Sequence, residues 1–227
     1  MEYTLVRSKR RTASIYVRES GVEVKAPLKM SKQAIDEFVI SKERWILKSL
    51  EEMNERAAQR SQFALGYGSM VLYLGREYPI AGWERKGTGF DGQRFLIPSK
   101  KQPEQIRSSC VELYRKLAKL YLQERTIAVA ERMGIVAPVI KISGAKTRWG
   151  SYNVRKTTRS KSINFTWRLI LAEQDAIEYV IVHELAHMME MNHSKRFWDI
   201  VACELPDYKV RMGKLRILQD RIYYEQW

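Results

Sequence analysis

The run HELAHMMEMNH, residues 183–193, contains all three histidines of this 227-residue chain. Its first five residues follow the pattern His-Glu-x-x-His, which random order would produce on the order of 0.003 times in a chain of this composition. On an α-helix, positions i and i+4 share one face and lie about 6 Å apart along the axis. The imidazoles of His183 and His187 can therefore both reach one zinc ion, at about 2.0–2.1 Å.

The neighbouring residues predict the rest of a metal centre. Glu184 would lie near the same helix face without reaching the ion, where it can take a proton from a zinc-bound water and deliver it to a leaving group. Glu190 would lie about 10 Å along a continuous helix from His183, so its carboxylate cannot share the ion. His193 can bend back if the helix ends after Glu190, with Asn192 in the left-handed conformation. In this HExxHxxxxxH segment we predict that the metal ligands are His183, His187 and His193, with water as the fourth ligand. We predict that Glu184 is the catalytic acid–base.

Hydrophobic periodicity on either side of this segment predicts an α+β fold. The helix that carries the motif is expected to open near residues 173–175 and to continue through Glu190. The other expected elements are strands within 3–27, a helix of about two dozen residues capped by Ser31, strands within 63–97, a helix over 104–133, strands at 139–143, 148–153 and 163–169, and helices over 194–203 and 209–224.

A proline-flanked link suggests how the chain divides into domains. Pro98 and Pro103 enclose the segment Ser-Lys-Lys-Gln. Because prolines and polar residues punctuate regular structure, we take this link as a boundary. We therefore predict a β-rich N-terminal region, residues 1–100, that packs on a catalytic domain, residues 101–227.

The chain is basic, and its excess charge is concentrated in one block. Forty Lys and Arg against 26 Asp and Glu give a net charge of +14, and residues 101–170 carry 15 basic and 4 acidic residues, or +11. No acidic residue occurs between Arg132 and Glu173. That interval holds eight basic residues: Lys141, Lys146, Arg148, Arg155, Lys156, Arg159, Lys161 and Arg168. Such a field attracts phosphates, nucleic acid or acidic peptides, or it is only a solvated face.

The composition excludes several classes of protein. Hydrophobic residues make up 45% of the chain and charged residues 29%, which is typical of a globular protein and not of a disordered or fibrous one. No apolar run approaches the roughly 20 residues that span a bilayer, so we expect no membrane partner. The only cysteines, Cys110 and Cys203, exclude a disulfide framework and a Cys-only zinc site. With no export signal visible at the N-terminus, we expect a cytoplasmic protein.

Further segments extend the pattern well beyond the histidines. They are KTRWGS at 146–151, INFTWRL at 163–169, YVIVHELAH at 179–187, NHSKRFW at 192–198 and LPDY at 205–208. With the N-terminal hairpin that ends at Pro27, these segments resemble the YgjP-like metallopeptidase family, which is related to the SprT-like and WLM zinc proteases. The resemblance implies a zincin-like fold, with the three histidines as ligands and Glu184 as acid–base. Tyr152 departs from the family pattern, in which a Cys is expected after Trp-Gly-Ser.

The resemblance also suggests which residues would contact a substrate. It places the Trp-Gly-Ser segment and the strand at 163–169 beside the metal helix. An edge strand at that place could bind an extended peptide by β-addition, or its basic groups could hold phosphates. The candidate substrate-binding residues are Arg148, Trp149, Gly150, Ser151 and Arg168.

Three functions are compatible with these observations. The first is a zinc-dependent peptidase that uses a metal-activated water, with other divalent transition metals able to occupy the same ligands. The second is a metal-dependent nucleoside triphosphate pyrophosphatase, UTP being the substrate named for some members of the resembled family. Against it, the chain has no phosphate-binding glycine loop of the GxxxxGK[ST] type and no carboxylate cluster for Mg²⁺. The third is a DNA-associated protease, or a nucleic-acid-binding module, that uses basic residues within 141–168.

Overall fold

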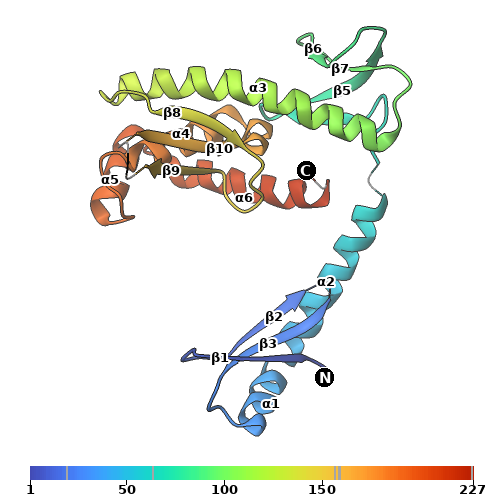
Figure 1. The fold of residues 1–227 in the computed structure, drawn as a ribbon, viewed down its shortest axis with the longest axis vertical. Coiled ribbons are helices and arrows are strands. Elements are labelled where there is room, and N and C mark those ends of the chain that lie inside the picture. The colour runs from blue at the N-terminus through green and yellow to red at the C-terminus, as the bar shows by residue number, and fades with distance from the viewer. Residues whose placement is uncertain (19, 63, 156, 158–159, 226) are drawn as a thin grey trace. The chain divides into compact units, whose positions relative to one another are not determined.

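The structure is a computed structural model that describes residues 1–18, 20–62, 64–155, 157, 160–225 and 227, with the side chains of 56–62 left out. It has two compact units, Met1–Phe63 and Ala64–Trp227 (Figure 1). In the described residues, helices and three small sheets confirm the α+β class. No described helix is both long and apolar enough to cross a membrane.

The first unit is a three-stranded sheet with two helices. Strand β3 (Gly21–Pro27) lies in the centre, antiparallel to β2 (Ser14–Arg18) and parallel to β1 (Thr4–Ser8). Alternate β3 side chains are buried against Ile35 and Ile46. The single helix expected after Ser31 is in fact two, α1 (Lys32–Ser41) and α2 (Glu43–Gln62). They separate at Lys42, which leaves the helical conformation (φ −110°, ψ 7°) while its N–H still bonds the last carbonyls of α1.

The second unit begins well before the expected boundary at residue 100. It contains a four-stranded sheet in the order β4-β5-β7-β6 and the long helix α3 (Pro103–Arg132). The Tyr114 hydroxyl of α3 donates to the Leu72 carbonyl at 2.6 Å, and the Leu74 N–H donates to the Ile170 carbonyl at 2.8 Å. These bonds join residues 64–100 to the rest of the unit, so the division falls at 63/64. The strands of this sheet are β4 (Met70–Tyr73), β5 (Arg76–Trp83), β6 (Gly89–Phe90) and β7 (Phe95–Pro98).

The second sheet of this unit positions the site. Strand β10 (Lys161–Thr166) is central, parallel to β8 (Val139–Ser143) and antiparallel to β9 (Gly150–Val154). Ile163 and Phe165 of β10 are fully buried on one face. The strand expected to reach Leu169 ends at Thr166, and the chain continues as a 3₁₀ turn, Trp167–Leu171.

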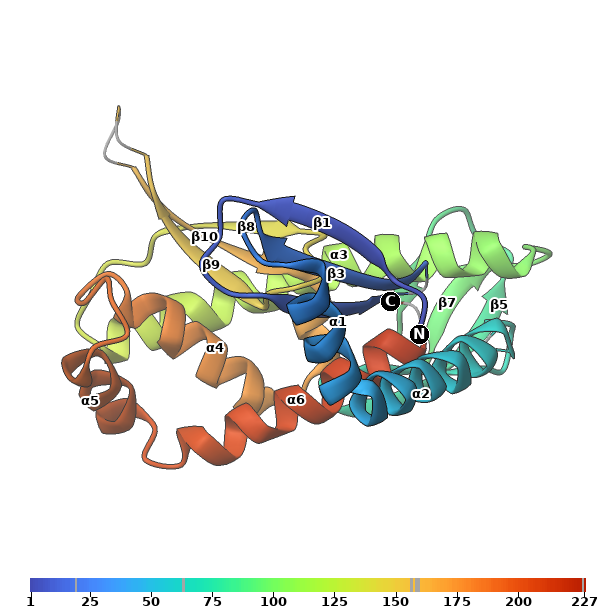
Figure 2. The same ribbon diagram turned by 90° about the horizontal axis from the view of Figure 1, so that it is seen from below.

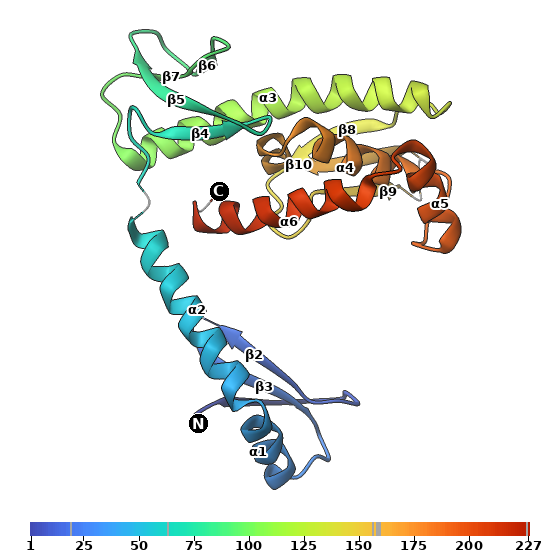
Figure 3. The ribbon, with the colours of Figure 1, turned by 180° about the vertical axis from the view of Figure 1, so that it is seen from behind.

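Three helices complete the unit, and α4 lies at its centre. Buried residues occur on every side of α4 (Gln174–Ala186), as expected for a helix enclosed by other elements. Helices α4, α5 (Lys195–Glu204) and α6 (Tyr208–Tyr224) follow one another along one side of the unit (Figure 2). Figure 3 shows α4 between the sheet and α6. Glu178 of α4 joins its neighbours, since it binds Arg132 of α3 at 2.7 Å and Arg211 of α6 at 2.8 Å.

Candidate metal centre

The structure brings the three histidines of the motif together. One ring nitrogen from each of His183, His187 and His193 lies within 4.8 Å of the other two. The Nε2 atoms of His183 and His193 are 3.1 Å apart. Two nitrogens bound to one tetrahedral zinc would be separated by about 3.4 Å, so this spacing already approaches that of a ligand pair.

The chain reverses earlier than the sequence predicted. Helix α4 ends at Ala186 rather than continuing through Glu190, and His187 is its C-cap. The N–H groups of Met189 and Glu190 both bond the Ala186 carbonyl, which closes a tight turn directly after the second histidine. Asn192 is not left-handed, because among the described non-glycine residues only Leu74 and Lys100 have positive φ. The early turn leaves enough chain for His193 to return to the cluster.

Aromatic side chains hold the imidazoles in place. Phe197 is fully buried, and its ring centroid lies 5.0, 4.6 and 4.7 Å from those of His183, His187 and His193. Ser194 caps α5 by accepting a hydrogen bond from the Phe197 N–H, which fixes this ring immediately after the third histidine. Trp198 stacks on His193 at 5.8 Å. The rings therefore have little freedom to turn away from one another.

The lowered pKa values of His183 and His187 suit metal binding. Burial, and then the neighbouring imidazoles, lower the pKa of His183 to about 4. Burial also lowers the pKa of His187. The Nδ1 atom of His187 lies 3.3 Å from the Glu190 carbonyl oxygen, so Nε2 is the nitrogen available to a metal. Neutral imidazoles oriented by a backbone carbonyl are the donors that zinc takes in proteins. The three histidines thus fit one divalent transition metal. Glu190 takes part by orienting the His187 ring with its backbone carbonyl, and its carboxylate has no part in the cluster.

Glu184 lies beside the cluster in a nearly dry environment. Glu184 is 6% exposed, and this burial raises the pKa of its carboxyl group to about 7. A hydrogen bond from the Tyr152 N–H and the charge of Arg148 lower the same pKa, but their effect is smaller than that of burial. Gly150 provides the space, because a Cβ at that position would lie 2.6 Å from the Glu184 Cγ and Oε1 atoms. The carboxyl group is therefore held against the start of β9 by contacts on both sides.

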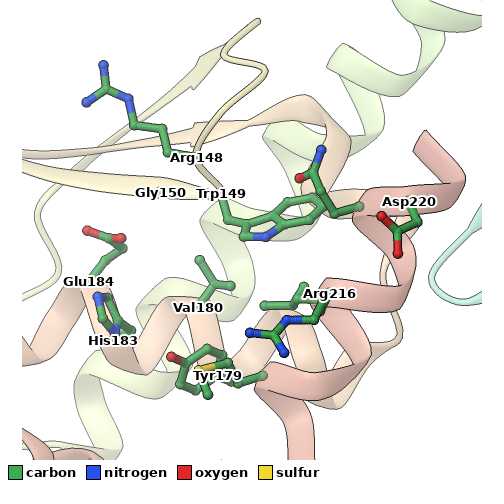
Figure 4. Close-up of a pocket in the computed structure, with 12 residues that line it drawn as sticks. Arg148, Trp149, Gly150, Tyr179, Val180, His183, Glu184, Arg216 and Asp220 are labelled. Carbon is green, nitrogen blue, oxygen red and sulfur yellow. The ribbon is translucent and has the colours of Figure 1, made fainter. Parts of the chain in front are cut away.

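A cavity of about 500 Å³ opens from Glu184 and His183 (Figure 4). Trp149 and Gly150 form one side, and Tyr179 and Val180 of α4 form its floor. Figure 4 shows Trp149 across the cavity from Arg216, with Asp220 at the end farthest from Glu184. The residues that α6 contributes are Met212, Leu215, Arg216, Gln219 and Asp220.

The α6 residues were missed by the sequence analysis. Their spacing of three and four positions places them on one helix face, and this periodicity was the available signal. It does not distinguish a cavity wall from an ordinary packed or solvated face. The side chains are assembled with the motif only through the packing of α6 on α4.

Two of the expected substrate-binding residues lie elsewhere. Arg168 is 7% exposed, and its guanidinium lies 4.5 Å from the Trp167 ring and donates to the Gly144 carbonyl at 3.0 Å. The Ser151 side chain accepts a hydrogen bond from Asn153. Neither Arg168 nor Ser151 lines the cavity, whereas Arg148, Trp149 and Gly150 do. Arg168 thus fastens the loop after β8 instead of framing the cleft.

Comparison with known proteins supports a metal-dependent function. A family model described as the YgjP-like metallopeptidase domain matches residues 11–217. No curated protein matches the chain. No solved structure matches it either. The matched region covers most of each compact unit and the whole histidine cluster, and the family name indicates a metal-dependent hydrolase.

Proposed function

Because the chain belongs to the YgjP-like metallopeptidase family, we propose that it is a zinc-dependent peptidase with a zincin-like catalytic unit. The observation that carries this proposal is the position of Glu184, buried beside three convergent imidazoles at the end of a cavity. We assign His183, His187 and His193 as the metal ligands. A metal held there would polarise the scissile carbonyl, and manganese or nickel could occupy the same ligands.

Glu184 would act as the general base and then as the general acid. With a pKa of about 7, its carboxyl group is available in both protonation states near neutral pH. It would take a proton from the attacking water and later pass it to the leaving nitrogen. Peptide hydrolysis requires both of these proton transfers. The Tyr152 N–H holds the carboxylate in position during this exchange.

The edge of β9 offers a place for an extended peptide. In the described part of the sheet, β9 pairs with β10 alone. The Trp149 carbonyl accepts from the Thr166 N–H, so by the alternation of antiparallel pairing the backbone groups of Gly150 and Tyr152 face outward. The Tyr152 N–H is already bonded to Glu184, which leaves Gly150 as the outward group nearest the base. A substrate strand paired there would bring its peptide bond beside Glu184.

The cavity would receive a side chain of the bound peptide. Its apolar lining includes Trp149, Tyr179, Val180 and Leu215, which suits a large apolar or aromatic group. Arg216 and Asp220, both exposed, place opposite charges toward its outer end. We propose that this cavity, rather than the metal cluster, selects among peptide sequences.

One observation favours a nucleotide as the alternative substrate. Two arginines, Arg148 and Arg216, border the cavity together with the planar ring of Trp149, a combination that could hold a triphosphate and a base. The single carboxylate in the lining besides Glu184, that of Asp220, provides no cluster for Mg²⁺. A nucleoside triphosphate pyrophosphatase is therefore the second candidate.

The test compares wild-type protein with Glu184→Gln, each loaded with zinc, on a quenched fluorescent peptide library and on UTP and ATP. We expect peptide cleavage that falls by about 10²- to 10⁴-fold in the variant, because the base is lost while the amide keeps its volume. Glu190→Gln is the matched control and should retain both metal and activity.

The outcomes separate the two substrates. Peptide cleavage at the wild-type rate in Glu184→Gln would refute the assigned base. Glu184-dependent release of pyrophosphate from UTP, without peptide cleavage, would replace the peptidase by the nucleotide hydrolase. Zinc analysis of each variant ensures that the comparison concerns Glu184 and not metal loss.

A further inference from the structure

The sheet of β8, β9 and β10 has a second face that the metal centre does not use. By the strand registers, Lys141 lies beside Asn164 and Ser151, and the next row is Val139, Ser162 and Asn153. The neighbours that alternate with them, Ile163 and Phe165, are buried on the opposite side. We call the surface formed by Val139, Lys141, Ser151, Asn153, Ser162 and Asn164 the outer face. Lys161 alternates with this row, so it and Arg155 line the hollow from the ends of β10 and β9 that meet at their connection.

The outer face is polar and carries charge of one sign only. It encloses a shallow hollow of about 330 Å³, lined by Lys141, Arg155 and Lys161 and by asparagine and serine side chains. The three cationic side chains are exposed. No carboxylate lines the hollow, and residues 133–172 contain none in the sequence. Charges of the same sign with no acidic partner between them create a field that favours a polyanion.

We propose that the outer face binds the phosphodiester backbone of a nucleic acid without regard to base sequence. Lysine, arginine, asparagine and serine side chains are the groups that donate to phosphate and sugar oxygens in protein–nucleic acid complexes. Neighbouring strands lie about 4.8 Å apart, so side chains on β8 and β9, which flank β10, are separated by roughly 10 Å. One polynucleotide strand can span this distance. Lys156 and Arg159 belong to the same basic segment but lie outside the described residues.

The lining favours a nucleic acid over an acidic peptide. Among the described residues, the apolar side chains that line the hollow are those of Val139 and Val154, and no aromatic ring lines it to receive a side chain or a base. Recognition must therefore come from charge and from hydrogen-bond donors, which a regular phosphate backbone engages at every repeat. A natural acidic peptide intersperses its carboxylates with other side chains, for which the hollow offers few apolar contacts.

Only part of the basic segment takes part in this surface. Arg168 is buried against Trp167, and Arg148 lines the cavity beside Glu184. Among the described basic residues of 141–168, those that line the hollow are Lys141, Arg155 and Lys161, and we assign the predicted nucleic-acid contact to these three. This binding is independent of the proposed peptidase activity.

The experiment measures fluorescence anisotropy of a labelled single-stranded DNA 20-mer of mixed sequence, titrated with the full chain at several salt concentrations. The test variant is Lys141→Gln/Arg155→Gln/Lys161→Gln. The control variant, Lys29→Gln/Lys86→Gln/Lys119→Gln, removes the same charge from exposed positions elsewhere. An unlabelled poly-glutamate 20-mer serves as competitor.

We expect wild-type binding to weaken with salt, and the test variant to bind at least about tenfold more weakly, with a log–log salt slope smaller by roughly 2 because three phosphate contacts are lost. The control variant should bind nearly as the wild type does. Glu184→Gln should bind DNA unchanged, so a failed peptidase assay would not affect this result.

Three results would overturn the proposal. They are the absence of salt-dependent DNA binding by the wild type, equal loss of binding in the test and control variants, and competition by poly-glutamate as strong as that by unlabelled DNA. The last result would reassign the outer face to acidic proteins. Circular dichroism of each variant verifies that the comparison is made between folded chains.

Discussion

The two sides of the cavity differ in how their residues come together. One side, which we call the motif wall, includes the proposed base and consists of Arg148, Trp149, Gly150 and the α4 residues Tyr179, Val180, His183 and Glu184. The other, the α6 wall, consists of residues between Met212 and Asp220. The motif wall is fixed by contacts so close that a methyl group would not fit between Gly150 and Glu184. The α6 wall is joined to α4 mainly through packing and ion pairs. We infer that the motif wall determines the chemical reaction and that the α6 wall determines which substrates are accepted.

The largest expected effect is that of His187→Ala. Removing one of three converging imidazoles leaves two ligands, and even a residue that only orients a ligand typically changes metal affinity by 10- to 100-fold. We therefore expect an affinity for zinc reduced by more than about 100-fold and no measurable hydrolysis. Zinc content after dialysis, measured by mass spectrometry, provides the test. Full zinc retention would refute the three-histidine site.

Gly150→Ala should damage the motif wall without removing the metal. The added Cβ would lie 2.6 Å from the Glu184 carboxyl group, so Glu184 must move. A displacement of about 1 Å at a reacting group can reduce the rate about 10²-fold. We expect a fall of that order in kcat, with zinc content unchanged. Wild-type kcat in a folded Gly150→Ala protein would show that the contact with Glu184 has no catalytic importance.

Changes in the α6 wall should affect substrate preference more than rate. Met212→Ala enlarges the cavity, and Arg216→Gln removes a charge from its lining. We expect KM or sequence preference to change by about three- to tenfold for either variant, with a small change in kcat. Both side chains are exposed, so each should contribute less than the roughly 1–3 kcal/mol of a methylene enclosed in a pocket. Peptide-library profiling measures this. Val210→Ala, an exposed α6 position outside the cavity, is the control, and an equal change there would refute the assignment.

Glu178 connects the two walls and should make the second unit sensitive to acid. Burial raises the pKa of Glu178, but the hydrogen bonds from Arg132 and Arg211 outweigh burial and hold that pKa below its ordinary value of 4.5. A lowered folded-state pKa stabilises the folded state fully above the unfolded-state value, and this stabilisation is lost as pH falls through the folded-state pKa.

Glu178→Gln tests this connection. We expect it to lower the free energy of unfolding by on the order of 1 kcal/mol at about pH 7 and to have a smaller effect at about pH 3.5. Urea unfolding at the two pH values is the measurement. A difference between wild type and variant that stays constant with pH would exclude an ionised Glu178 as the stabilising group.

The sequence predicted the parts of the molecule that depend on local pattern. The α+β class and the family are confirmed, and the structure brings His183, His187 and His193 together as expected. The catalytic and ligand roles of these residues and of Glu184 stay predictions. Spacing along one helix was sufficient for the first two histidines because helical geometry alone places them on one face.

Features that depend on tertiary contacts were not predictable in this way. The end of α4 at Ala186 was missed because no glycine or proline marks it. The burial of Arg168 follows from its contact with Trp167 and from carbonyl groups in a distant loop. Residues 64–100 join the second unit through backbone bonds to residues 170 and 171, for which the sequence carries no signal.

The contact of Phe197 with all three imidazoles makes α5 a partner in metal retention. A metal held by His183 and His193 would act as a cross-link across the nine residues between them, and Phe197 would transmit that restraint to the first turn of α5. A ligand that binds only the closed, folded state stabilises that state against local opening by RT ln(1 + [L]/Kd). Amide hydrogen exchange in α5 should therefore slow when metal binds, and the start of this helix would report metal occupancy without any substrate.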